Sequence, residues 1–135
     1  MPWLIVSAAV LLGIAATAKA AVDTLTHQAG NNIFEAMGSW WDARTSWKNK
    51  YKPGSWEAGH PTPRFWGSTS LFVFVTDFWH FADFIYLTAF LLSGLLCGLA
   101  IADSPWWAVP LVVLTYKAAF GAVFELLYQR VFRSK

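Results

Sequence analysis

Three long apolar runs constrain this 135-residue chain more than any other feature. They extend from Trp3 to Val22, from Leu71 to Ala102 and from Trp106 to Phe132. Each reaches the roughly 20 residues that a helix needs to cross about 30 Å of hydrocarbon. Hydrophobic residues make up 56% of the chain and charged residues 13%, a balance that is unlike that of a soluble globule. The sequence therefore predicts an all-α integral membrane protein that forms one transmembrane helical domain over residues 1–135, with three transmembrane helices at about 3–22, 71–102 and 105–132.

Basic residues are distributed unevenly between the segments that flank these runs. The connection between the first two runs and the C-terminal end are rich in Lys and Arg, whereas residues 102–105 contain none. The positive-inside rule then predicts an N-terminus outside and a C-terminus in the cytoplasm. Ala18-Lys19-Ala20 resembles a signal-peptide cleavage site, but no Lys or Arg precedes the first run, so we expect an uncleaved helix. We expect the protein in a bacterial inner (plasma) membrane.

Residues 41–70 form the one long polar connection, and they combine large aromatic residues with cations. Pro53-Gly54 and His60-Pro61 argue against regular structure, but five Trp, Tyr and Phe residues from Trp47 onward are too many for a disordered segment. We expect an ordered cytoplasmic loop at headgroup level, whose cations meet lipid phosphates. Stacking on single-stranded nucleic acid fits the same pattern, but the membrane tether makes that partner the weaker hypothesis. The residues predicted to contact lipid headgroups are Lys48, Lys50, Lys52 and Arg64.

A polar stripe follows the first apolar run. Asp23, His27, Asn31 and Glu35 recur every four residues, which places them on one face of a helix. This spacing predicts that the first helix continues to about residue 37.

The second apolar run contains three ionisable residues. Asp77 and His80 are three residues apart and share one helical face, whereas Asp83 points elsewhere. If this helix begins at Leu71, Asp83 and Lys117 lie at a similar depth in the membrane. We therefore predict an ion pair between Asp83 and Lys117, because an unpartnered charge at that depth is costly.

The remaining ionisable residues are predicted to converge at the cytoplasmic side of the three-helix bundle. Histidine and carboxylate side chains are the ligands that zinc, iron and manganese use in helix bundles. A metal-bound water there, with Asp77 or Glu125 as the general base, suits a metal-dependent enzyme acting on a phospholipid or a polyprenyl phosphate. The predicted metal ligands are Asp23, His27, Asp77, His80 and Glu125.

Two alternatives use the same residues differently. In the first, they form a buried polar network in a non-catalytic subunit of a larger membrane complex. In the second, His27 and His80 hold a haem in an electron carrier. Gly94 and Gly98, with the small residues beside them, predict close helix packing, either within this bundle or in a homo-oligomer or larger complex.

Overall fold

The computed structural model describes residues 2–133, and its long helices follow the three apolar runs. α1 extends over Pro2–His27, α3 over Phe78–Ala100 and α4 over Ala108–Leu126. All three are long and apolar enough to cross a membrane, which confirms the predicted fold class. The shorter elements are η1 Ile33–Met37, α2 Ala43–Ser46, η2 Trp47–Lys50, η3 Val73–Val75 and the π-helical turn η4 Leu127–Val131 that follows α4.

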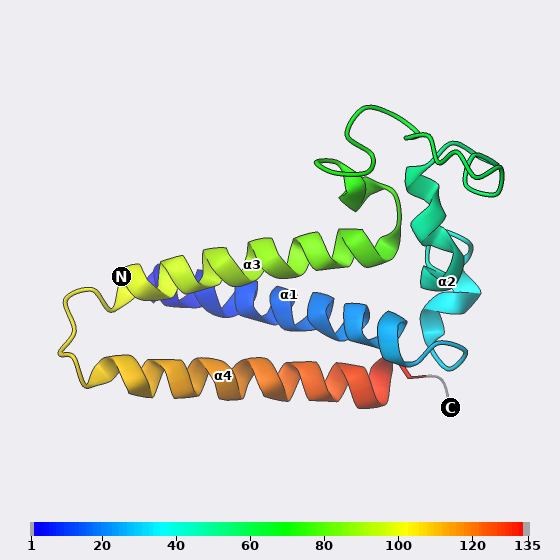
Figure 1. The fold of residues 1–135 in the computed structure, drawn as a ribbon. Helices are drawn as coiled ribbons and strands as arrows, with labels where there is room; N and C mark the ends of the chain where they lie inside the picture. Colours follow the sequence, from blue (N-terminus) through cyan, green and yellow to red (C-terminus); the bar gives the residue numbers. More distant parts are fainter. Residues whose placement is uncertain (1, 134–135) are drawn as a thin grey trace.

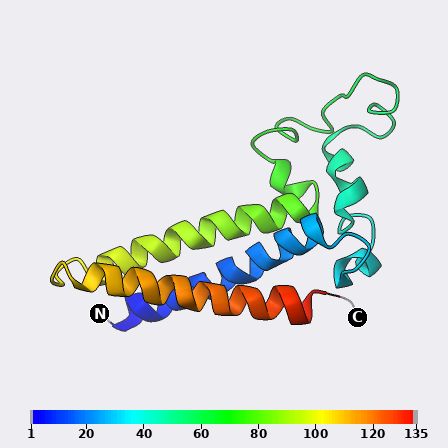
Figure 2. The ribbon, with the colours of Figure 1, turned by 60° about the horizontal axis from the view of Figure 1, so that its bottom comes forward.

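The three long helices lie side by side, and α3 runs antiparallel to α1 and α4 (Figures 1 and 2). The first residues of α1 and the last residues of α4 therefore lie at opposite ends of the bundle. We call the end where α1 and α4 finish the loop end, because residues 28–77 project sideways from it (Figure 1). We call the opposite end, which carries residues 101–107, the far end.

Small side chains bring α1 and α3 close together. Ala15, Ala16 and Ala20 of α1 are fully buried. Ser93 of α3 is also fully buried, and its hydroxyl donates a hydrogen bond of 2.6 Å to the backbone carbonyl of Ala8. Such contacts stabilise helix pairs in membranes, where burial of apolar surface gives little driving force between helices.

The predicted Gly94–Gly98 contact is absent from this helix pair. Both glycines are exposed, and a Cβ atom added at either position would meet nothing within 4 Å. They are one and five residues after Ser93, which is the residue that faces α1, and this rotation turns them away from α1.

Helix α4 packs less tightly than the other two. None of its residues is buried. Its contacts with α3 run through long aromatic side chains, since Tyr116 and Phe120 both meet the ring of Phe90 at 5.8 Å between centroids. The Tyr116 hydroxyl also lies 3.3 Å from the backbone carbonyl of Phe90. Most of α4 is thus uncovered by the rest of this chain.

Helix α1 ends at His27, so the predicted extension to residue 37 is wrong. Gly30 adopts a left-handed conformation, with φ of +83°, that ends the helical register. Asn32 then caps η1 by accepting the backbone N–H of Phe34 at 3.0 Å. The buried ring of Phe34 anchors this segment among aromatic neighbours from three other segments: Trp41, Phe78 and Phe132.

Helix α3 begins at Phe78, seven residues after the predicted start at Leu71. Asp77 is in an extended conformation, with φ of −158° and ψ of 163°, and its side chain caps the helix. The apolar residues before it do not lengthen the helix. They fold back beside α3, where the ring of Phe74 stacks on Phe84 with 4.4 Å between centroids.

The loop between α2 and η3 is ordered, as predicted. The backbone N–H of Lys52 donates to the carbonyl of Thr62 at 2.8 Å, and that of Arg64 donates to the carbonyl of Lys50 at 2.9 Å. Trp56, which lies within this closed segment, packs edge-on against Trp47 of η2, with 4.8 Å between ring centroids. The predicted aromatic cluster therefore holds the loop together.

Candidate functional site at the loop end

Asp77 and His80 form the predicted pair. Oδ2 of Asp77 lies 2.7 Å from Nδ1 of His80, and Oδ1 accepts the backbone N–H of the same residue at 3.0 Å. The hydroxyl of Thr76 lies 3.1 Å from Oδ2. Asp77 is only 1% exposed, so these contacts replace nearly all of its hydration.

Burial and hydrogen bonding act in opposite directions on Asp77. Burial by itself raises the pKa of the carboxyl, because it disfavours the ionised form. The ring and backbone N–H groups of His80 and the Thr76 hydroxyl favour the carboxylate, and they leave the pKa of Asp77 below its ordinary value. The carboxylate is therefore ionised at neutral pH and holds the Nδ1 proton of His80.

A hollow of about 380 Å³ opens beside this pair, between the end of α1 and the start of the loop. Its walls include Trp47, Trp79, Arg44 and both members of the pair. The indole N–H of Trp79 donates to the Thr26 hydroxyl at 2.9 Å, which ties α3 to the end of α1. The contact with Asp77 uses Nδ1 of His80, so Nε2 is the ring nitrogen left to contact a group in the hollow.

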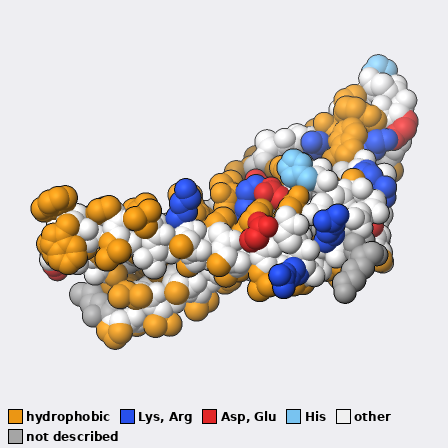
Figure 3. Space-filling model, turned by 90° about the horizontal axis from the view of Figure 1, so that it is seen from below, with side chains coloured by type: hydrophobic (Ala, Val, Ile, Leu, Met, Phe, Trp, Pro, Cys, Tyr) orange, Lys and Arg blue, Asp and Glu red, His pale blue; other side chains and the backbone are white. Residues whose placement is uncertain are grey.

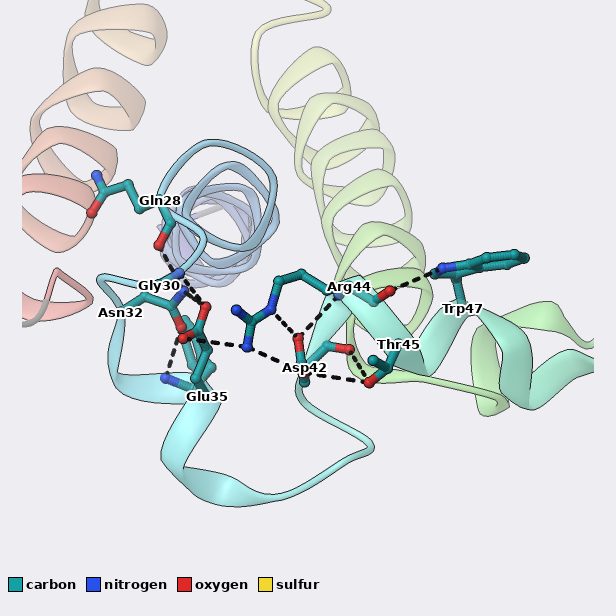
Figure 4. A network of polar contacts seen from close by, with 9 residues as sticks. Gln28, Gly30, Asn32, Glu35, Asp42, Arg44, Thr45 and Trp47 are labelled. Atoms are coloured by element: carbon teal, nitrogen blue, oxygen red, sulfur yellow. Dashed lines mark hydrogen bonds and ion pairs between the residues drawn. The ribbon is translucent and has the colours of Figure 1, made fainter.

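Arg44 organises a polar network on the other side of this hollow (Figure 4). Its Nε lies 2.9 Å from Oδ1 of Asp42, and one terminal nitrogen lies 3.7 Å from Glu35. Glu35 also accepts from the side-chain amide of Asn32 at 3.2 Å. The network therefore connects η1, α2 and the turn after α1.

Arg44 and Asp42 in this network stabilise each other's charged form. The hydrogen bond from Arg44 lowers the pKa of Asp42, and the same contact raises the pKa of Arg44. Arg44 stays well exposed, so water screens these contacts. Their main effect is to fix the position of the loop.

The predicted metal ligands do not converge. Among residues 2–133, no group of three or more His, Cys, Asp and Glu side chains is placed to hold a metal ion. Asp77 and His80 lie together, but Asp23 forms an ion pair with Lys19 instead. His27 and Glu125 are both exposed. The five side chains therefore do not form the predicted shared site, and one reason is that α3 begins seven residues later than expected, which changes the depths of Asp77 and His80.

The catalytic and haem hypotheses also require side chains that the structure does not bring together. Asp77 is buried against His80, while Glu125 lies on the uncovered helix α4, so the two carboxylates do not face a shared hollow. The hollow beside His80 is lined by Thr26 and not by His27. It therefore offers a haem one histidine instead of two.

The predicted ion pair between Asp83 and Lys117 is also absent from the ion pairs of residues 2–133. Asp83 follows Phe78 by five residues, which is about 8 Å from the loop end. Lys117 precedes Val131, the last residue of η4, by fourteen residues, which is about 21 Å from the same end. The late start of α3 therefore puts the two charges at different depths.

The cations predicted to contact lipid headgroups have different surroundings. Lys48 pairs with Glu57 at 2.6 Å, and Lys50 lies over the rings of Trp47 and Tyr51. Lys52 and Arg64 make no side-chain ion pair with residues 2–133.

Sequence reasoning missed two features of this end. The i, i+4 spacing of Lys19 and Asp23 is a signal that could have found their ion pair. The contact of Arg44 with Glu35 has no such signal, because it depends on the turn between η1 and α2. No protein family model matches this chain, and no curated protein or solved structure matches it either.

Proposed function

We propose that this protein is a non-catalytic subunit of a larger membrane complex, and that α4 contacts the neighbouring subunit. One observation carries the proposal. Lys117 is exposed on α4 and has no hydrogen bond or ion pair with any of residues 2–133.

The position of Lys117 along α4 makes this exposure costly in lipid. It follows Ala108 by nine residues, which is about 14 Å from the far end of a helix that also continues about 21 Å toward the loop end. An ammonium group near the middle of the bilayer costs about 2.5–3.5 kcal/mol on translocon insertion scales. A carboxylate supplied by a neighbouring helix removes most of this cost.

A second copy of this chain does not supply that carboxylate. Copies with the same orientation place equivalent residues at equal depth, so a copy offers its own Lys117 at this depth and none of the carboxylates of its three long helices. The carboxylates of α1, α3 and α4 lie nearer the loop end: Asp23 is already paired, and Asp83 and Glu125 are about 8 Å and 9 Å from that end. The partner is therefore a different chain with an acidic side chain near the middle of the membrane.

The surface of α4 around Lys117 fits a close helix contact. Ala118, Gly121 and Ala122 are all exposed, and a Cβ atom added at Gly121 would meet nothing within 4 Å. Small residues of this kind allow the backbones of two membrane helices to approach.

The test compares the size of the native complex for two substitutions at one position. Complexes are extracted in mild detergent from the native membrane, and their mass is measured for the wild type, Lys117→Met and Lys117→Arg. We expect a large complex for the wild type and for Lys117→Arg, and a monomer for Lys117→Met. A monomeric wild type, or a Lys117→Met complex of unchanged mass, would show that α4 does not assemble in this way.

A further inference from the structure

A second hollow, of about 440 Å³, lies in the ordered loop, away from α4 and from the Asp77–His80 pair. It forms where α2 and η2 meet the segment that follows Tyr51, and three cations line it: Lys48, Lys52 and Arg64. Glu57 is the one carboxylate on its wall, and it pairs with Lys48 at 2.6 Å. Lys52 and Arg64 therefore give the hollow an uncompensated positive charge.

The wall of this hollow also contains a buried hydroxyl with no partner. Ser46 is 2% exposed, and its Oγ makes no hydrogen bond with residues 2–133. An unpaired buried hydroxyl is costly, and native structures rarely keep one without a function or a bound group. The hydroxyl and the two cations are the donors that an anion with several oxygens needs.

The frame around the hollow is rigid without help from the cationic side chains. Lys52 and Arg64 are fixed through their backbone N–H groups, which donate to the carbonyls of Thr62 and Lys50. The buried Ser68 hydroxyl adds a bond of 2.7 Å to the carbonyl of Lys50. The side chains of Lys52 and Arg64 are therefore available for a ligand.

We propose that this hollow binds a phosphate group, with Lys52 and Arg64 neutralising its charge and the Ser46 hydroxyl donating to one of its oxygens. The ligand chemistry is that of a phosphate, carried either by an anionic phospholipid or by a free phosphate ion.

The adjacent segment brings the hollow close to a membrane surface, since Trp66 is 80% exposed and Leu71 is 64% exposed. The same segment packs along the first turns of α3 through Phe74. Figure 3 shows that charged side chains gather toward this loop end, while the rest of that face is mostly apolar.

The experiment uses the purified full-length protein in a neutral detergent, after removal of bound lipid. In one arm, inorganic phosphate is titrated and the heat of binding is measured. In the other arm, equal amounts of phosphatidylglycerol and phosphatidylcholine are added to the delipidated protein, and the lipid that stays bound is identified by native mass spectrometry. Phosphate binding in the first arm identifies a free phosphate ligand, and preferential retention of phosphatidylglycerol with no phosphate binding identifies a lipid headgroup.

Three variants test the position of the site. The double substitution Lys52→Gln/Arg64→Gln should weaken binding at least about tenfold, since each cation contributes a charge-assisted hydrogen bond. The matched control is Lys50→Gln/Arg130→Gln, which removes two positive charges at the same end of the protein but outside the hollow, and it should change binding by no more than about twofold. Ser46→Ala should weaken binding without lowering the melting temperature, because its hydroxyl has no partner in the fold.

Several results would overturn the proposal. Absence of binding in both arms would do so directly. An equal loss for the two double variants would mean that this end of the protein attracts anions diffusely. Unchanged binding in Ser46→Ala would place the ligand elsewhere.

Discussion

Replacement of Asp77 tests how the start of α3 is fixed. Asp77→Ala removes the cap of this helix, which costs about 0.5–2 kcal/mol in typical proteins. It also removes the partner of the His80 ring N–H, which adds about 1–2 kcal/mol because that ring is only partly exposed, at 22%. We therefore expect Asp77→Ala to lower the free energy of unfolding by about 1.5–4 kcal/mol.

Asp77→Asn separates the two contributions. The Asn side-chain oxygen can still accept the backbone N–H of His80, so the cap is preserved while the negative charge beside the ring is lost. We expect this variant to lose about 1 kcal/mol, between the wild type and Asp77→Ala. Asp103→Ala, at an exposed position near the far end, is the matched control and should change stability by no more than about 0.5 kcal/mol.

The assay is unfolding in mixed micelles with increasing SDS, followed by tryptophan fluorescence. Amide hydrogen exchange of Phe78, Trp79 and His80 provides a local measurement, and exchange at His80 should accelerate most in Asp77→Ala. The reasoning is refuted if Asp77→Asn is as unstable as Asp77→Ala, or if Asp77→Ala is no less stable than Asp103→Ala.

Two further predictions concern pH and the contact between α1 and α3. Because the pKa of Asp77 is lower in the folded protein, its ionised form stabilises the fold above the ordinary aspartate pKa, and this contribution is lost as the pH falls below about 4. Acid titration of the unfolding free energy should therefore show a larger loss for the wild type than for Asp77→Asn, and equal losses would contradict the assignment. Ser93→Ala removes the hydrogen bond to the Ala8 carbonyl and should cost about 0.6–1.7 kcal/mol in the same SDS assay, whereas Thr88→Ala, at an exposed position on α3, should cost less.

The class of the fold follows from the amino-acid sequence alone. Lipid offers no hydrogen-bond partners to backbone N–H and C=O groups, and a helix is the structure that pairs all of them within one segment. Apolar runs of about 20 residues therefore predict membrane-spanning helices. The contact between Asp77 and His80 was also predictable from their spacing, because side chains three residues apart lie close together both within a helix and at its N-cap. The order in the loop followed from its aromatic residues for a comparable reason, since such side chains bury themselves against one another.

The first residue of α3 depends on packing between segments, and much of the site depends on that residue. The apolar residues from Leu71 to Val75 suit a helix in lipid as well as a turn packed on Phe84, so composition does not distinguish the two. In the structure these residues form the packed turn, so Asp77 caps α3 instead of lying inside a longer helix. The later start of α3 also explains why Asp83 and Lys117 lie at different depths, since their predicted pairing assumed a start at Leu71. Contacts between distant segments, such as Arg44 with Glu35, leave no periodic signal in a sequence, because turn geometry and packing determine them.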